Sequence, residues 1–442
     1  MLVCTSFFFY MCWNVKYSLL MLLSILITYF TGILLDKYSQ NQKAKRLLLT
    51  FGTLTNLFIL VYFKYFNFLI DSVNKVFGAE FHFIDVLLPV GISFYTFQAI
   101  GYTFDVYFKK INAEKNFINY TLFVSFFPQL VAGPIERSVN MLEQFRTKPR
   151  FDISNIKNGG TLILYGLFEK IVVSDRLAIF TDGVFDNYEK MSPLLLILGA
   201  VFFSVQIYAD FSSYTHIARG SAQLMGYHLM KNFDSPYLAV NIRDFWKRWH
   251  ISLTSWFTDY LYIPMGGSRI SPLRTYFNIA IVFLVSGLWH GANTTFLVWG
   301  ALHAVAQIVF RMYDKHIGVK LKYIDWIMTY SFICFSYIFF RSKTMQDALV
   351  YVGNIFVSKQ SLQASISELP LNITELYISI GLVIIMFLLD IARKRIKDVM
   401  IWFNSKHIIT QSIMYSALMV SIVTIGIYGT KYIEKPFIYF QF

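Results

Sequence analysis

The chain has few charged residues and very few cysteines for its length. Only 15% of its 442 residues are charged and three are cysteine, whereas soluble domains average about 25% charged residues. The three cysteines lie scattered in apolar segments, so their spacing excludes a disulfide framework and a cysteine metal site. With a hydrophobic fraction of 56% and a mean hydropathy of +0.51, this composition excludes a soluble globular protein and indicates a chain embedded in a membrane.

Several motifs of soluble enzymes are also missing from the sequence. No G-x-S-x-G string occurs, which disfavours a serine hydrolase of the soluble type. No H-E-x-x-H zinc helix and no glycine-rich phosphate loop occur either. The histidines have no metal-ligand spacing, so we expect no bound metal.

Long apolar runs dominate what is present. They do not alternate as β-barrel strands do, and they therefore predict membrane-spanning helices. The candidate spans are 17–36, 47–70, 86–108, 117–135, 159–181, 193–209, 274–290, 294–312, 325–341, 373–391 and 410–429. We predict an all-α polytopic membrane protein with about 10–12 transmembrane helices, forming a single domain over residues 1–442.

Two apolar stretches carry polar or helix-breaking residues. The first, 86–108, contains Pro89, Gly91, Gly101 and Asp105. The second, 204–228, contains Gln206, Asp210, His216, Arg219 and Gly220. Broken segments are tolerated at membrane depth only inside protein or beside water, so both stretches predict re-entrant or interior elements.

The net charge of +13 has a topological explanation. Lys and Arg cluster at 37–46, 146–157 and 393–397, as cytoplasmic loops of membrane proteins do. We therefore expect the bilayer, not nucleic acid, to be the partner that this charge reflects. One further span at 410–429 would place the C-terminus outside.

His290 is the most informative residue, since it lies between the apolar runs 276–289 and 294–310. A titratable group at membrane depth is costly and usually faces a cavity or a partner. Burial keeps an imidazole neutral and basic, which suits a general base acting on a hydroxyl. The alternative is a histidine that merely forms hydrogen bonds between helices.

The surrounding block, 204–303, concentrates polar and aromatic residues and is the predicted catalytic region. Its string Arg243 to His250 interleaves cations with rings, which predicts an amphipathic helix lying in the membrane interface. Lys247 and Arg248 could instead attract a polyanionic donor, and the two interpretations are compatible. His250 follows directly, and two histidines flanked by tryptophan make a site more plausible than either one alone.

Three strings carry a resemblance to a known family. They are FFPQLVAGPIER (126–137), DFWKRWHISLTSWFTDYLYIPMGGSR (244–269) and SGLWHGANTTFLVWGALH (286–303). They resemble the membrane-bound O-acyltransferase superfamily, in particular its bacterial alginate O-acetyltransferase-like branch. The terminal string from Phe437 to Phe442 is similar to that branch too. The family's near-invariant catalytic histidine falls on His290, and its second characteristic histidine falls on His250.

The resemblance implies acyl transfer to a hydroxyl through the membrane core, with helices around a central funnel. The branch implies cytoplasmic acetyl-CoA as donor and an extracytoplasmic polysaccharide as acceptor: alginate-like, another exopolysaccharide or peptidoglycan. It also implies a bacterial cytoplasmic (inner) membrane location and an SGNH-hydrolase-like acetyltransferase partner outside the membrane.

The chain departs from the family pattern at two places. The family has one more apolar segment before the string at 9–14, so we expect this chain to lack the family's first helix. The string usually written DFSGYSD is DFSSYTH here, with Ser213 for Gly and His216 for Asp. No role is carried over to His216.

Acyl transfer needs a base, donors for the oxyanion and exclusion of water. We predict His290 as the base, and His250 as a residue that positions the donor or bridges the path of the acceptor. Asn293 could donate to the oxyanion or orient a partner, or simply pack in a helix interior. Asp210 could orient a histidine or pair with Arg219. His303 fits a structural role better than a catalytic one.

Tyr439 suggests a covalent relay. If the aromatic C-terminus folds back into the interior, its phenol could accept acetyl and pass it to a partner, which splits one hard step into two. The alternative is an aromatic anchor at the membrane interface.

Two other functions stay open at this stage. One is D-alanyl transfer to teichoic acid within the same superfamily. The other is a transporter or flippase, which also uses interior charges and broken helices. The sequence shows no repeated pair of interrupted segments, which counts against transport.

Overall fold

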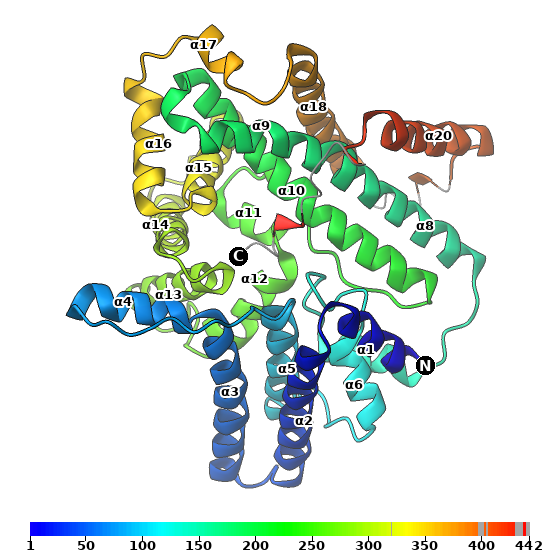
Figure 1. Ribbon diagram of the computed structural model, residues 1–442. Helices are drawn as coiled ribbons and strands as arrows, with labels where there is room; N and C mark the ends of the chain where they lie inside the picture. The colour runs from blue at the N-terminus through cyan, green and yellow to red at the C-terminus, as the bar shows by residue number, and fades with distance from the viewer. Residues whose placement is uncertain (320, 397–401, 404, 429–435, 439–442) are drawn as a thin grey trace. The chain divides into compact units, whose positions relative to one another are not determined.

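The computed structural model describes all residues except 320, 397–401, 404, 429–435 and 439–442. Every regular element in the described part of the chain is a helix (Figure 1), which confirms the all-α prediction. Contacts divide the chain into two compact units. Unit 1 comprises 1–160, 218–230 and 255–261, and unit 2 comprises 161–217, 231–254 and 262–442.

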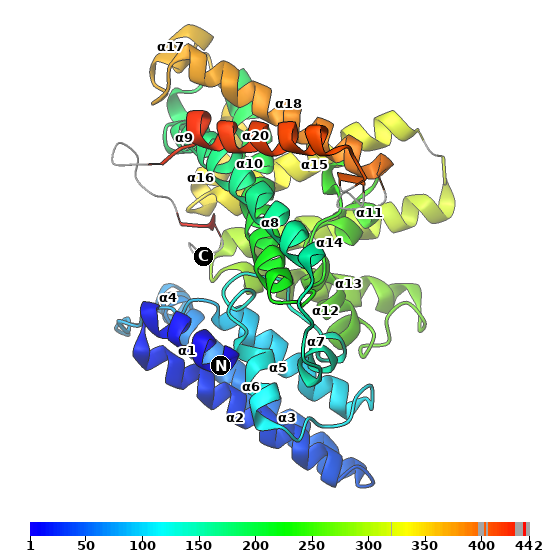
Figure 2. The same ribbon diagram turned by 90° about the vertical axis from the view of Figure 1, so that its right-hand side faces the viewer.

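Unit 1 is built from the N-terminal helices. They are α1 (Leu2–Trp13), α2 (Val15–Lys37), α3 (Gln42–Lys64), α4 (Phe66–Phe77), α5 (Ile92–Tyr107), α6 (Phe117–Ser125) and α7 (Ser138–Arg146). Asn14 and Asn41 cap α2 and α3. Their side chains accept hydrogen bonds from backbone N–H groups of the first turn, which have no partner within the helix. α2, α3 and α5 pack side by side (Figures 1 and 2).

The remaining helices belong to unit 2 or run between the units. They are α8 (Ile153–Leu167), η1 (Phe168–Ser174), α9 (Asp175–Asp186), η2 (Tyr188–Lys190), α10 (Pro193–Leu224), η3 (Pro236–Leu238), α11 (Ile242–Arg248), α12 (Ile251–Phe257), η4 (Thr258–Tyr262), α13 (Pro272–His290), α14 (Thr294–His316), α15 (Lys322–Arg341), α16 (Met345–Val357), α17 (Leu362–Ser367), α18 (Ile373–Arg395) and α20 (Ile408–Ile425). η1 and η4 are π-helices, and η2 and η3 are 3₁₀ turns.

Within the described part of the chain, eight helices are long and apolar enough to cross a membrane: α2, α3, α10, α13, α14, α15, α18 and α20. The protein is a multi-pass membrane protein. Three of the predicted spans lie outside this set: 86–108, 117–135 and 159–181. The span 117–135 loses its helix after Ser125, where a stretch with Pro128 and Pro134 follows, and 159–181 passes through the π-helix η1.

The two polar stretches are interior, as predicted, although only one is broken. Fourteen of the sixteen residues of α5 are buried, and the helix begins only after Gly91, whose φ of +74° favours glycine. By contrast, α10 is one continuous helix of 32 residues. Its polar side chains do not break the backbone because they have partners inside the protein, such as Thr181 for Gln206 and Lys170 for Asp210.

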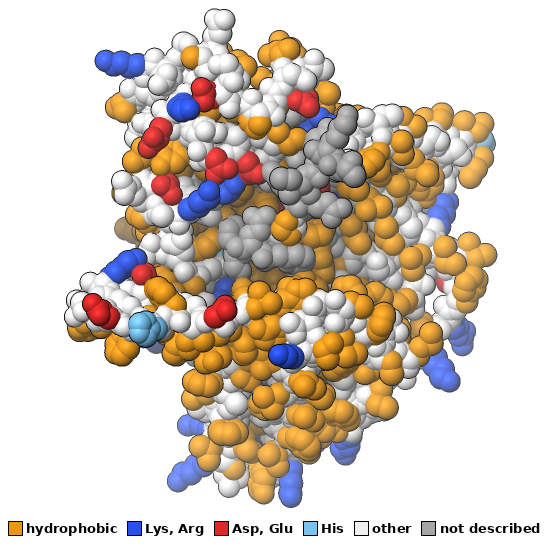
Figure 3. Space-filling view, in the orientation of Figure 1, with side chains coloured by type: hydrophobic (Ala, Val, Ile, Leu, Met, Phe, Trp, Pro, Cys, Tyr) orange, Lys and Arg blue, Asp and Glu red, His pale blue; other side chains and the backbone are white. Residues whose placement is uncertain are grey.

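The surface of unit 1 fits a membrane environment. Exposed apolar side chains cover α2 and α3, among them Leu19, Leu23, Phe30, Leu47, Phe51, Leu54 and Phe58. Lys and Arg side chains gather at the end of these helices, where their connecting loop lies (Figure 3). Such a division, apolar along the helices and basic at one end, is typical of a lipid-facing surface.

Glycines set the close contact between α13 and α14. A Cβ on Gly287 would lie 2.3 Å from the Phe296 carbonyl oxygen, and one on Gly300 would lie 2.4 Å from the Phe283 carbonyl oxygen. Small residues let membrane helices approach at backbone distance. This contact holds the turn that connects the two helices, and His290 lies at that turn.

Candidate active site

His290 is the last residue of α13 and is buried, with 4% of its surface exposed. The helix stops there because Gly291 is extended and Asn293 begins the next helix. The imidazole is therefore placed by a tight turn between two packed helices, not by a mobile loop. A rigid support of this kind fixes the direction of a reacting side chain.

Aromatic rings surround the His290 imidazole. The ring centroids of Trp289, Trp299 and Phe340 lie 5.1, 5.1 and 5.3 Å from it, all at steep interplanar angles. Such walls exclude water, and electrostatic interactions are stronger in a dry site.

His250 lies between α11 and α12 and is fully buried. Its φ of +44° is in the left-handed region, which is uncommon for a residue other than glycine. Strained backbone of this kind is concentrated at functional sites. Burial lowers the pKa of His250 from 6.5 to about 3, so the ring is neutral at physiological pH.

Asn232 fixes the tautomer of His250. The Asn232 Oδ1 atom accepts hydrogen bonds from the backbone N–H of Ser252 at 3.1 Å and from its hydroxyl at 2.9 Å. A backbone N–H can only donate, so this amide atom is the oxygen. His250 Nδ1, 3.2 Å from the same oxygen, therefore carries the proton. Nε2 is left as the nitrogen with the basic lone pair.

Trp289 joins the two histidines. Its ring centroid lies 5.7 Å from that of His250 and 5.1 Å from that of His290. Phe211 of α10 closes the other side of His250, at 4.7 Å. Two motifs about 40 residues apart in the sequence therefore meet around one tryptophan in unit 2, and His250 and His290 form the candidate active site.

Comparison with known proteins identifies the family of the chain. Residues 7–345 match the family described as MBOAT, membrane-bound O-acyltransferase family.

The chain belongs to this family.

Named relatives make the relationship more specific. The chain is 38% identical over 378 residues to the peptidoglycan O-acetyltransferase of Helicobacter pylori, covering 79% of this chain and 72% of the relative. It is 36% identical over 353 residues to the probable alginate O-acetylase AlgI of Pseudomonas aeruginosa, covering 79% and 68%. A teichoic acid D-alanyltransferase of Bacillus subtilis is 26% identical over 276 residues, covering 58% and 69%. The protein is an O-acyltransferase, and family membership favours this function over transport.

A third buried histidine of the acyltransferase, His303 in α14, has both ring nitrogens in hydrogen bonds. Nδ1 lies 3.2 Å from the indole Nε1 of Trp246, which can only donate, so Nδ1 accepts. Nε2 lies 3.1 Å from the Ser336 hydroxyl and must donate to it. This geometry gives His303 a role in holding α14, α11 and α15 together.

Asn293 caps α14 instead of packing in a helix interior. Its Oδ1 accepts from the backbone N–H of Thr295 at 3.2 Å, and its amide donates to the Lys343 carbonyl at 2.8 Å. Of the two alternatives for Asn293, the helix-interior position is ruled out, because the chain turns at Gly291 and Asn293 precedes the first turn of α14. Asn293 supports the His290 turn from this place.

The two predicted donor-binding cations differ in their surroundings. Arg248 donates to Asp244 at 2.8 Å and to the Asp234 carbonyl at 3.2 Å, so much of its charge is already compensated. Lys247, one residue earlier in α11, is exposed. Phe245, Trp246 and Trp249 are buried, so α11 has the predicted amphipathic character.

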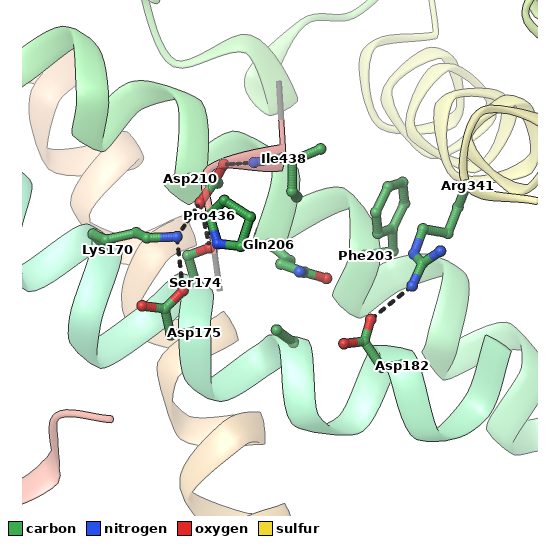
Figure 4. Close-up of a pocket in the computed structure, with 11 residues that line it drawn as sticks. Lys170, Ser174, Asp175, Asp182, Phe203, Gln206, Asp210, Arg341, Pro436 and Ile438 are labelled. Carbon is green, nitrogen blue, oxygen red and sulfur yellow. Dashed lines mark hydrogen bonds and ion pairs between the residues drawn. The ribbon is translucent and has the colours of Figure 1, made fainter. Parts of the chain in front are cut away.

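Asp210 contributes to a separate polar cavity in unit 2, of about 60 Å³ (Figure 4). Its carboxylate accepts from Lys170 at 2.8 Å, from Ser174 at 3.2 Å and from the backbone N–H of Ile438 at 2.7 Å. The expected pairing with Arg219 does not fit, because nine residues along one helix rise about 13.5 Å. The cavity is lined by Lys170, Ser174, Asp175, Ala178, Asp182, Phe203, Gln206, Asp210, Arg341, Pro436 and Ile438.

Residues that the sequence analysis did not single out complete these surroundings. The π-helix η1 supplies Glu169, whose buried carboxylate lies 2.7 Å from His216 Nδ1. The imidazole that replaces the usual aspartate thus meets a carboxylate from another helix. Neither Glu169 nor Asn232 belongs to a recognisable motif. The one signal for Glu169 in the sequence is that a charged residue lies inside an apolar stretch.

The last two points concern Tyr439 and metal binding. Tyr439 lies outside the described residues, which resume the tail at Pro436 to Ile438. Among the residues that the structure describes, no group of three or more His, Cys, Asp or Glu side chains could hold a metal ion.

Proposed function

We propose that this acyltransferase moves an acetyl group from acetyl-CoA to a hydroxyl of a polysaccharide outside the cytoplasmic membrane of a bacterium. The identity of 36–38% to O-acetyltransferases of peptidoglycan and alginate supports acetyl as the acyl group. The observation that carries the reaction type is that His250 and His290 both pack against Trp289.

The proposed reaction uses His290 as general base. The imidazole takes the proton of the acceptor hydroxyl, whose oxygen attacks the thioester carbonyl carbon. A C–O bond forms, the C–S bond breaks, and the imidazolium returns its proton to the departing thiolate. His250, a buried neutral ring with Nδ1 bonded to Asn232, positions the donor or bridges the path of the acceptor in this proposal.

The C-terminal tyrosine supports a two-step version of this proposal. In that version the Tyr439 phenol accepts the acetyl group first, and an SGNH-like partner outside the membrane takes it from the aryl ester. The exposed Lys247, near Arg248, would attract the phosphates of the donor at the cytoplasmic side.

The test is thiol release from acetyl-CoA by the protein in liposomes, supplied with an alginate or peptidoglycan fragment. We expect release from the wild type and loss of release in His290→Ala. His303→Gln is the matched control, since it changes another buried histidine of the same helix pair. Equal release in His290→Ala and wild type would remove His290 from the chemistry. Turnover of a D-alanyl carrier protein in place of acetyl-CoA would favour teichoic acid alanylation, to which the 26% identical relative points.

A further inference from the structure

The end of the chain contacts η1, α9 and α10. Beyond α20, the backbone N–H of Ile427 donates to the carbonyl of Ile171 at 3.0 Å. The Arg176 guanidinium donates to the Ile425 carbonyl at 2.5 Å. Farther along, the backbone N–H of Ile438 donates to Asp210 at 2.7 Å. Ile425, Ile427 and Ile438 therefore lie beside α9, η1 and α10, respectively.

The π-helix creates the side-chain arrangement that receives this segment. In η1 the Asp175 N–H donates to the Lys170 carbonyl, five residues back, instead of four. This wider turn brings residues 170, 174 and 175 to one side of the helix. As a result Lys170 reaches both Asp175 and Asp210, at 2.8 Å each, and Ser174 reaches Asp210 as well (Figure 4).

Asp210 depends on the described end of the chain, residues 436–438 (the tail), for part of its hydrogen bonding. Its side chain is 2% exposed, and the Lys170 ammonium that faces it is shared with Asp175. A buried carboxylate needs several donors to be stable. The Ile438 N–H supplies one of them, and Lys170 also lies 4.5 Å above the Phe437 ring. The tail and the carboxylate thus stabilise each other.

Helix α15 contacts both the cavity that Ile438 lines and the candidate active site. Arg341, at the end of this helix, lines the same cavity as Ile438. The preceding residue, Phe340, packs against the His290 ring at 5.3 Å. The tail is therefore held in the same unit as His290, with the two sites joined through consecutive residues of one helix.

We propose that η1 and Asp210 form a docking site for the chain's own C-terminal segment, and that Asp210 is a positioning residue for acetyl transfer. The second part rests on the proposed function. Asp210 acts through the Ile438 amide and touches no reacting atom. It fixes the position of Ile438, the last residue that the structure describes.

Thiol labelling tests the docking without any acetyl transfer. Ile438→Cys keeps the backbone N–H and places a thiol at a buried position, in a background with Cys4, Cys12 and Cys334 replaced. We expect Asp210→Asn to speed maleimide labelling of this thiol about 10-fold, the loss typical of one hydrogen bond to a charged group. Asp182→Asn is the matched control, because Asp182 lines the same cavity but pairs with Arg341. No increase in Asp210→Asn, or an equal increase in Asp182→Asn, overturns the proposal.

A second variant covers the case in which Asp210→Asn does not fold. Ile438→Pro removes the donating N–H and leaves every carboxylate in place. We expect Ile438→Pro to lower acetyl transfer, and the double variant to lose no more than Asp210→Asn alone, since the Ile438 amide acts through Asp210. Additive losses, or faster labelling with unchanged transfer, overturn the positioning role. Loss of transfer in His290→Ala tests the proposed function separately.

Discussion

At the scale of single residues, the candidate site depends on how one histidine is oriented by a distant side chain. Asn232 is 18 residues before His250 and accepts from both the ring and Ser252. In many enzymes the partner that fixes a tautomer matters almost as much as the reacting group. Asn232 therefore provides the sharpest test of whether His250 takes part in transfer.

We expect Asn232→Ala to reduce acetyl transfer per folded protein by about 10–100-fold, because small misplacements of catalytic groups have costs of this size. Asn278→Ala is the matched control, since Asn278 is equally buried in unit 2 and bonds the carbonyls of Met265 and Gly267. The measurement is initial rate at saturating donor, with folded protein quantified by gel filtration. Equal rates for the two variants would show that the orientation of His250 is irrelevant.

His250 also predicts a pH dependence of stability. Its folded pKa, about 3, lies below the ordinary 6.5, so the folded state binds this proton less readily than the unfolded state. Stability from this group is present above pH 6.5 and is lost as the pH falls toward 3. At pH 5 the loss is about 2 kcal/mol relative to pH 7.

The measurement is chemical denaturation of the detergent-solubilised protein at both pH values. His250→Gln removes the titrating group while keeping a polar side chain. Between pH 7 and pH 5, we expect this variant to lose about 2 kcal/mol less stability than the wild type. An identical loss in wild type and variant would contradict the burial of a neutral imidazole.

At the scale of elements, the contact between α13 and α14 determines where His290 lies. Gly287 and Gly300 face each other so closely that a Cβ on either would meet backbone atoms of the other helix. Backbone atoms cannot move aside as a flexible side chain can, so an added methyl group must separate the helices.

We predict that Gly300→Ala destabilises the protein by about 1–3 kcal/mol, the usual cost of overpacking, and lowers transfer through displacement of the His290 turn. Gly353→Ala, within α16, is the control because a Cβ there meets nothing within 4 Å. That change should be neutral or stabilising by about 0.4–1 kcal/mol. Thermal unfolding and transfer rates of both variants provide the test, and unaltered values for Gly300→Ala would refute the close packing.

At the scale of the whole molecule, the distribution of basic residues predicts how the chain crosses the membrane. The loop between α2 and α3 lies in the basic stretch 37–46, and α3 leads from it to α4. We expect this loop in the cytoplasm and the end of α4 outside.

Lys43→Cys and Val76→Cys, both at exposed positions, test this topology in the cysteine-replaced background. An impermeant maleimide should label position 76 in intact cells and position 43 only after the membrane is opened. The reverse pattern would invert the orientation, and labelling of both positions in intact cells would show that α3 does not cross.

The sequence analysis was successful where local patterns are sufficient. Apolar runs predicted α2, α13, α14 and α15 within a few residues, because each helix satisfies its own backbone hydrogen bonds in lipid. It failed at α10, where polar residues suggested a break. Their partners lie on other helices, and the pattern within one segment could not show them. The same reason hid the capping position of Asn293, which depends on the turn at Gly291.

The sequence by itself determined that this protein is an all-α membrane protein and which family its motif strings resemble, since composition and motif strings are local properties. The tertiary structure alone decided which side chains meet. It brought His250 and His290 into contact with Trp289, gave His250 its tautomer through Asn232, and joined Asp210 to an amide 228 residues away. Such contacts arise from the packing of helices against each other, and no pattern within a single helix encodes them.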